Sequence, residues 1–177
     1  MGRIKIPGPA KLIIGFIFKE EAILNKAKIL LEKRFGRIDF ESQDLPFCHT
    51  DYYKDEFGID LKRKFVSFTK LIFPQDLTKI KIATNKIEKR LSKVPRRLIN
   101  IDPGYLDLAK LVLASTKDYK HRIYINCGIY AEVTLFYEKG SFRPWEWTYP
   151  DYITSGYIEI FNRLREIYSM QLKRVKK

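Results

Sequence analysis

Apolar and polar residues in the first third of the chain alternate with the periods of strands and helices. Residues 12–18 form a short, almost continuous apolar run, which is typical of a buried strand. Residues 20–35 place apolar side chains on one helical face, begin with acids and precede Gly36, so we expect a helix there. Residues 38–42 alternate and predict a second strand, whereas residues 44–60 are polar and aromatic and predict a loop.

The middle of the chain repeats this succession. Residues 64–72 have the alternation of a third strand. Pro74 opens a second helix, whose apolar stripe at helical spacing consists of Leu77, Ile80, Thr84, Ile87 and Leu91. Residues 98–101 predict a fourth strand, and Asp102-Pro103-Gly104 predicts a turn that ends it.

The last third completes the predicted fold. Residues 105–115 are apolar on all sides and are interpreted as a short buried helix, a hairpin follows at 122–137, and Thr154 begins a final amphipathic helix. The elements predict an α+β fold with a mixed, mainly antiparallel sheet in ferredoxin-like β-α-β-β-α-β order, plus an added β-hairpin and a C-terminal helix. We expect a single domain over residues 1–177, with a loose N-terminal arm at 1–9 and a basic tail at 173–177.

Burial favours one register for the predicted hairpin. A two-residue turn would mix polar and apolar side chains on both faces, whereas a three-residue loop at 127–129 separates them. This register pairs Tyr124 with Glu132 and Arg122 with Thr134. It predicts one apolar face, which consists of Ile123, Ile125, Ala131, Val133 and Leu135.

The opposite face of this hairpin gathers groups that can bind an anion and move a proton. Arg122 supplies a cation, Tyr124 a phenol and Glu132 a carboxylate, and Lys117 and His121 lie just before them in the chain. Glu132 is a candidate base and His121 a candidate acid. The alternative is an ordinary solvated sheet face, on which Arg122 and Glu132 form an ion pair worth about 0.2–1 kcal/mol.

Other residues carry candidate chemistry, each with a structural alternative. Asp102 follows a predicted strand and could act as an acid or base or as a metal ligand, or cap a turn. Lys117 and Asp118 could bind and orient a phosphate, or end a helix. Trp145 and Trp147 could stack on bases, or hold their loop against the core. The ligand-binding candidates are Lys117, Asp118, Arg122, Tyr124, Trp145 and Trp147.

The charge of the chain points to anionic partners. Lysine and arginine number 34 against 21 acids, which gives a net charge of +13. This excess attracts nucleic acid, nucleotides or an acidic membrane surface, although it can also serve solubility. Residues 38–60 hold seven acids and one base, whereas residues 61–97 hold twelve bases and two acids. The uneven distribution predicts a polarised surface on which the acidic segment packs against the basic one.

Several motifs are missing from the sequence. No apolar run reaches the roughly 18 residues of a membrane span, and no signal peptide is recognisable, so we expect a cytoplasmic protein with reduced Cys48 and Cys127. The cysteines and histidines form no metal-binding cluster, so no metal is expected, and no cofactor is indicated. A GxxxxGK[ST] loop is absent, and residues 85–88 (NKIE), which faintly resemble a guanine-specificity motif, lie in a predicted helix with Ile87 in its core.

Long segments of the chain resemble one known family. The similarity to the bacterial family called domain of unknown function 4416 rests on AKLIIGFIF, RFGRIDFESQDLPF, TDYY, IDPGYLDLAKLVLASTKDYKHRIYI, GIYAEVTLFY and PWEWTYPDY. It covers nearly the whole chain but implies no defined activity, although members are sometimes labelled GTP-binding. The matching motif positions are Asp51, Asp102, Lys117, Asp118, His121, Arg122, Tyr124, Glu132, Trp145 and Trp147.

Three functions follow as hypotheses. The first is binding of an anionic, phosphate-containing ligand, a nucleotide or an RNA, at a polar face built from residues 102–152. The second is a small-molecule hydrolase or transferase that uses Glu132 or Asp102 as base and His121 as acid. The third is a non-enzymatic interaction module that uses the aromatic segment and the basic tail.

Overall fold

The computed structural model describes residues 2–47, 60–93 and 96–175, and this part of the chain contains nine strands, three α-helices and two short 3-10 helices. Asp51 and Cys48 lie outside the described residues. The elements are β1 (Ala10–Phe18), α1 (Glu21–Phe35), β2 (Ile38–Glu41), β3 (Leu45–Phe47), β4 (Leu61–Ile72), η2 (Pro74–Asp76), α3 (Leu77–Leu91), β5 (Ile99–Leu106), β6 (Lys110–Ser115), β7 (Ile123–Asn126), β8 (Ile129–Glu138), β9 (Ser141–Pro144), η3 (Pro150–Ile153) and α4 (Ser155–Val175).

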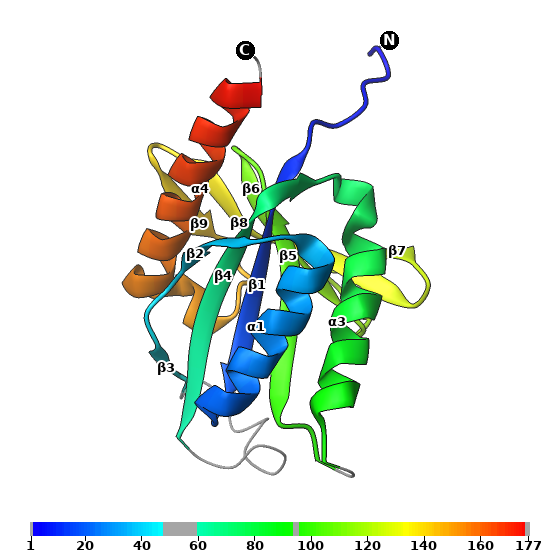
Figure 1. Cartoon of the computed structure of the whole chain (residues 1–177). Coiled ribbons are helices and arrows are strands. Elements are labelled where there is room, and N and C mark those ends of the chain that lie inside the picture. The colour runs from blue at the N-terminus through cyan, green and yellow to red at the C-terminus, as the bar shows by residue number, and fades with distance from the viewer. Residues whose placement is uncertain (1, 48–59, 94–95, 176–177) are drawn as a thin grey trace.

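All the strands pair antiparallel in one sheet of order β2-β4-β1-β5-β6-β8-β7, with β3 paired to β4 and β9 paired to β8. Helices α1 and α3 cover one face of this sheet (Figure 1). Helix α4 packs against the other face and against β9. The expected α+β class with a mainly antiparallel sheet and a C-terminal helix is confirmed. Along the chain, β3 is an additional strand between β2 and β4, and α4 extends into the expected basic tail as far as Val175.

The central strand β1 shows why the fold has two cores. All nine of its residues are buried. Leu12, Ile14 and Phe16 point to the core beneath α1 and α3, whereas Ile13 points to the core that contains Phe161 of α4. A strand buried on both faces reads as a continuous apolar run, so the central position of β1 follows from its sequence.

A buried lysine connects α4 to the sheet. The Lys11 ammonium forms an ion pair with Asp39 and donates hydrogen bonds to the Phe68 carbonyl and to Gln171 Oε1, both at 2.8 Å. Burial lowers the pKa of Lys11, while the Asp39 carboxylate acts in the opposite direction. These contacts join β1, β2, β4 and α4, and we interpret them as structural.

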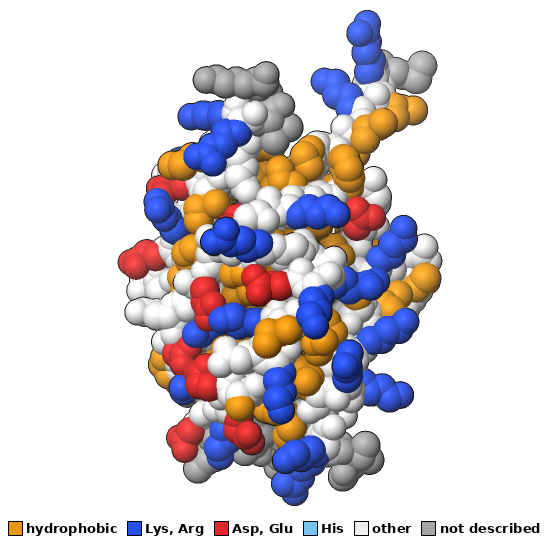
Figure 2. All heavy atoms as spheres, in the orientation of Figure 1, with side chains coloured by type: hydrophobic (Ala, Val, Ile, Leu, Met, Phe, Trp, Pro, Cys, Tyr) orange, Lys and Arg blue, Asp and Glu red, His pale blue; other side chains and the backbone are white. Residues whose placement is uncertain are grey.

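The acidic and basic segments meet where β2 and β3 pair with β4. Lys64 lies 3.1 Å from Glu41 and 2.8 Å from Asp44, and Lys62 lies 3.0 Å from Asp44. Figure 2 shows acidic side chains toward the β2 and β3 side of this view and basic side chains gathered over α3. On this face the acidic and basic side chains are therefore unevenly distributed, and the acidic segment packs against the basic one as the sequence predicted.

The expected buried helix at residues 105–115 is wrong. Residues 105–106 end β5 and residues 110–115 form β6. Leu111 points to the core of α4, whereas Val112 packs with Leu77 of α3. The segment is apolar on all sides because both faces of the sheet are covered here, which periodicity alone cannot distinguish from a buried helix.

The predicted register of the hairpin is also wrong. Asn126 pairs with Ile129 and Tyr124 with Tyr130, across a two-residue turn whose Cys127 has a φ of 49°. A bulge shifts the register next to the turn, and β7 forms an edge of the sheet with Ile123 74% exposed. The expected apolar face therefore does not bury β7, because the core of this region lies beneath β6 and β8.

None of the described helices is long and apolar enough to cross a membrane.

Candidate ligand-binding site

Pro103 ends the pairing between β5 and β6. These strands pair at three positions, beginning with Gly104 opposite Leu113. In an antiparallel ladder, the N–H groups of every second residue point to the same neighbouring strand. After Gly104, the next N–H that would point to β6 is that of residue 103. This residue is proline, which has no backbone N–H to donate. β5 and β6 therefore separate. The predicted turn at 102–104 is wrong, because these residues lie within β5 and pair with β1.

Side chains of α3 take the place of the missing strand partner along β5. The Ile101 N–H donates to Glu88 Oε1 at 2.5 Å, and Lys81 Nζ donates to the Ile101 carbonyl at 3.2 Å. Burial raises the pKa of Glu88, although the nearby Lys81 ammonium acts in the opposite direction. α3 thus satisfies backbone groups of β5 and brings a cation and a carboxylate into the gap.

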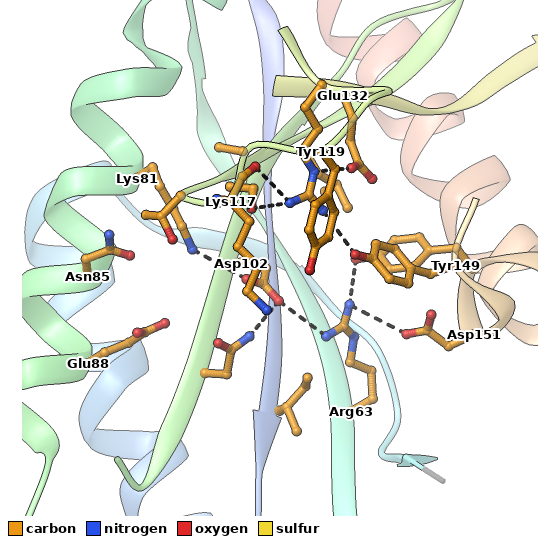
Figure 3. Close-up of a pocket in the computed structure, with 18 of the residues that line it drawn as sticks. Arg63, Lys81, Asn85, Glu88, Asp102, Lys117, Tyr119, Glu132, Tyr149 and Asp151 are labelled. Atoms are coloured by element: carbon orange, nitrogen blue, oxygen red, sulfur yellow. Dashed lines mark hydrogen bonds and ion pairs between the residues drawn. The ribbon is translucent and has the colours of Figure 1, made fainter. Parts of the chain in front are cut away.

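The gap between β5 and β6 forms a pocket of about 550 Å³, lined by α3 on one side and by residues of η3 on the other (Figure 3). This volume lies within the range of small-molecule sites, about 300–1,000 Å³. Tyr119, Tyr149 and Tyr152 add phenols to a strongly charged wall. The charged lining residues are Arg63, Lys81, Glu88, Arg97, Asp102, Lys117, Arg122, Glu132 and Asp151.

Asp102 lies at the centre of the pocket. Asn100 Nδ2 donates to its Oδ2 at 2.6 Å, Lys81 Nζ lies 3.4 Å from its Oδ1, and Arg63 Nη1 lies 3.6 Å from its Oδ2. The Asp102 side chain is 27% exposed. The other carboxylates of the pocket are less exposed, at 8% for Glu88, 2% for Glu132 and 9% for Asp151. Asp102 is therefore the pocket carboxylate most accessible to a ligand.

Arg63 of β4 forms a buried cationic floor beneath Asp102. Its Nη2 donates to Tyr152 Oη at 2.6 Å, but the nearest oxygens of Asp102 and Asp151 lie 3.6 and 3.9 Å from the guanidinium. Its Nε has no hydrogen-bond partner among the described residues. Burial would lower the pKa of Arg63, but Tyr152 and Asp151 raise it above the ordinary value. Charged pairs normally approach to about 2.7–2.9 Å, so the coordination of this buried cation is incomplete.

Glu132 of β8 forms a second, tighter cluster at the edge of the pocket. Its Oε2 accepts a hydrogen bond from Arg122 Nε at 2.7 Å and lies 3.1 Å from His121 Nε2, while its Oε1 accepts from Thr134 Oγ1 at 3.2 Å. Burial would lower the pKa of Arg122, but the Glu132 carboxylate raises it above the ordinary value. Both oxygens of Glu132 are therefore occupied by protein partners.

Both terminal nitrogens of Arg122 are also engaged. Its Nη1 donates to Ser115 Oγ at 2.7 Å and to the Lys117 carbonyl at 3.1 Å, and its Nη2 donates to Tyr149 Oη at 3.1 Å. The Tyr119 ring lies 4.6 Å from the guanidinium carbon. Arg122 thus connects the segment after β6 to Tyr149, and we interpret it as a positioning residue for the pocket wall.

The two tryptophans stack on protein rings. Trp145 and Trp147 are nearly parallel with centroids 5.2 Å apart, and His121 stacks against Trp147 at 6.2 Å. Phe136 packs on Trp145 at 4.5 Å, and Trp147 Nε1 donates to the Val133 carbonyl at 3.1 Å. The segment is thereby fixed along β8, which favours the structural interpretation of these tryptophans.

The structure brings only part of the predicted site together. Lys117 lines the pocket with Arg122 and Glu132. Asp118 does not line the pocket; it lies near Tyr130, and burial together with that carboxylate raises the pKa of Tyr130. Tyr124 packs against Tyr130 at 5.4 Å, so the expected pairing of Tyr124 with Glu132 is wrong.

Several pocket residues were not predicted from the sequence. They lie outside residues 102–152, on β4, on α3, at the start of β5 and just before it. They are Arg63, Lys81, Asn85, Glu88, Arg97 and Asn100. One signal could have found part of this set. Lys81, Asn85 and Glu88 are spaced four and three residues apart, which places them on one helical face. Within residues 85–88, Ile87 packs against the core, whereas Asn85 and Glu88 flank it and face the pocket.

The fold and the site define an α+β protein with a charged pocket at a break in an antiparallel sheet. Within the described ranges, no group of three or more His, Cys, Asp or Glu side chains is placed to hold a metal ion. The chain belongs to the family described as domain of unknown function (DUF4416), whose model matches residues 8–168. No curated protein and no solved structure matches the chain.

Proposed function

We propose that the pocket binds a small phosphate-bearing ligand of about nucleotide size. The observation that carries the proposal is Arg63, a guanidinium whose side chain is 3% exposed and whose carboxylate neighbours lie 3.6 and 3.9 Å away. A buried charge is stabilised best by close, hydrogen-bonded partners, and the two carboxylates near Arg63 are farther away than that. A ligand anion that reached this floor would complete its coordination without breaking a short ion pair.

The mixed charge of the lining supports a ligand with both an anion and hydrogen-bond donors. Lys81 and Lys117 offer further positive charge to a phosphate, while Asp102 and Asn85 offer acceptor oxygens to hydroxyl or amino groups. A nucleotide carries all of these groups, and inorganic phosphate carries only the anion. The pocket volume also favours a mononucleotide over an RNA strand at this site.

We further propose that the protein acts in the cytoplasm, which cell fractionation would test.

A ligand screen by thermal shift and calorimetry tests the proposal. Ribonucleoside mono- and diphosphates, sugar phosphates and inorganic phosphate should be compared, because a ligand at 100 times its Kd stabilises the folded state by about 2.7 kcal/mol. Asp102→Asn and Lys117→Gln should weaken binding, whereas Lys139→Gln, in the exposed turn between β8 and β9, should not. If no phosphate compound shifts Tm, or if all three variants bind alike, the proposal is wrong.

An enzymatic function is a second candidate, and it now rests on Asp102 rather than on Glu132. Asp102 is the most exposed carboxylate of the pocket and lies 3.4 Å from Lys81 Nζ, so it can exchange a proton with a bound ligand. Glu132 is committed to Arg122 and His121. A ligand found in the screen should be incubated with the protein and its products followed. Turnover that persists in Asp102→Asn would contradict this role.

A further inference from the structure

Helix α3 has an outward face that the pocket does not use. While Lys81, Asn85 and Glu88 point inward to the pocket, five other cations of this helix and its C-terminal end are exposed. They form what we name the outward stripe, namely Lys79, Lys86, Lys89, Arg90 and Lys93. None of the five forms an ion pair with any residue that the structure describes. Figure 2 shows this concentration of basic side chains over α3.

The spacing within the stripe is unfavourable for an isolated helix. Lys86 lies three residues before Lys89 and four before Arg90, so like charges lie side by side on the helix surface, and Lys93 follows just beyond the helix end. Glu88 is the one acid among the residues of α3, and it is buried. It therefore adds no negative charge to the outward stripe. A surface selected for solubility alone intersperses both signs, whereas here acids are concentrated on the β2 and β3 side.

The composition of α3 indicates which polyanion fits the stripe. Residues 77–91 contain no aromatic side chain, so the helix has nothing on which unstacked bases could stack. A duplex keeps its bases stacked internally and presents phosphates. The helical part of the stripe runs about 16 Å from Lys79 to Arg90 at 1.5 Å per residue, and Lys93 extends it beyond the helix end. This is long enough to meet several phosphates along a duplex.

We propose that the outward stripe of α3 docks the phosphate backbone of a nucleic-acid duplex. The contacts are sequence-independent, because lysine and arginine that reach only phosphates carry no base information. The proposal stands apart from the pocket, since none of the five stripe residues lines it. The pocket can fail to bind a nucleotide while the stripe binds a duplex, and the reverse also holds.

The test compares two triple variants that remove the same charge. The stripe variant carries Lys86→Gln, Lys89→Gln and Lys93→Gln. The control variant carries Lys26→Gln, Lys33→Gln and Lys139→Gln, which are also exposed but lie on α1 and the β8–β9 turn. Anisotropy of a labelled RNA duplex of about 20 base pairs, long enough to cover the stripe, is measured for the wild type and both variants between about 50 and 200 mM salt. Circular dichroism checks that each variant is folded.

The expected result separates specific docking from general attraction. The wild type should bind with a steep salt dependence, and the stripe variant should bind about tenfold or more weakly, with a salt slope smaller by about 3. The control variant should stay within about twofold of the wild type. A DNA duplex should behave like the RNA duplex, because the stripe contacts phosphates. Equal losses in both variants, tighter binding of single strands, or no binding by the wild type would overturn the proposal.

An internal control distinguishes this proposal from the function proposed for the pocket. Asp102→Asn should leave duplex binding unchanged, and the stripe variant should leave nucleotide binding unchanged. If Asp102→Asn abolished duplex binding, the duplex would be held at the pocket, and the stripe would not be its docking surface.

Discussion

Arg122 Nε lies 2.7 Å from Glu132 Oε2, and the two side chains are only 5% and 2% exposed. Removing one member of a buried pair leaves an unpaired charge and costs about 3–5 kcal/mol. Glu132→Gln should therefore lower the free energy of unfolding by about 3 kcal/mol, measured by urea denaturation. It should also loosen the contact between the segment after β6 and Tyr149.

A double-mutant cycle provides the control for this pair. Arg122→Met removes the cation, so Glu132→Gln introduced on top of Arg122→Met should cost much less than it does alone. Equal costs in the two backgrounds would show that Glu132 acts through Thr134 or His121 instead.

Gly104 is required where β5 and β6 touch. A Cβ at this position would lie 2.4 Å from the Val112 carbonyl oxygen, and backbone cannot move aside cheaply. Gly104→Ala should lower the free energy of unfolding by about 1–3 kcal/mol. Gly156→Ala in α4 is the matched control, because its Cβ would meet open space. That substitution should stabilise the protein by about 0.5–1 kcal/mol. If Gly104→Ala and Gly156→Ala changed the free energy of unfolding in the same direction and by similar amounts, the steric explanation would be wrong.

The ion pairs of Asp44, just before β3, with Lys62 and Lys64 of β4 predict a part of the stability that is lost in acid. The hydrogen bond from Lys64 is the main cause that lowers the pKa of Asp44 from 3.8 to about 2. Because the folded pKa is below the unfolded one, this contribution is fully present above about pH 4 and is lost as the pH falls through about 2. The stability difference between the wild type and Asp44→Asn should shrink over this interval in denaturation experiments. A difference that stayed constant from pH 6 to pH 2 would refute the linkage.

Lys86 connects the stability of α3 to its proposed docking role. Lys86→Glu places a carboxylate four residues before Arg90, which is the favourable order for a helical ion pair. The free energy of unfolding should rise by about 0.5 kcal/mol, while affinity for the duplex falls. Lys86→Gln removes the charge without adding the pair, so it should weaken binding with a smaller gain in stability. If this helix face had only a structural role, Lys86→Glu would raise the free energy of unfolding without lowering the affinity for the duplex.

The sequence predicts two kinds of element correctly: helices that bury one face, and short strands that are buried on both faces. β1, α1, α3 and α4 were recognised because their periodicity reflects a single packing partner on each face. The error at residues 105–115 arose where both sheet faces are covered, and the error at residues 102–104 arose because a proline inside a strand reads as a turn. The position of Pro103 at the unpaired edge of β5 depends on strand order, which no local pattern contains.

The site was predicted in part for the same reason. Arg122 and Glu132 lie close together as expected, but the contact comes from residues just before β7 rather than from the expected cross-strand register. Arg63 was missed because its importance depends on how β4 aligns with β1 and on what Tyr152 and Asp151 bring over it. These are long-range relationships between segments about 90 residues apart, which local sequence patterns do not report.

The short pairing between β5 and β6 is the place where the sheet separates into two halves. Three residue pairs join the half that contains β1 to the half that contains β8, and beyond them β5 forms hydrogen bonds with side chains of α3 instead of with β6. The pocket opens in this gap, with Asp102 on one half and Lys117 next to the other. A molecule held between these two residues would bridge the junction, and its binding would then stiffen the sheet.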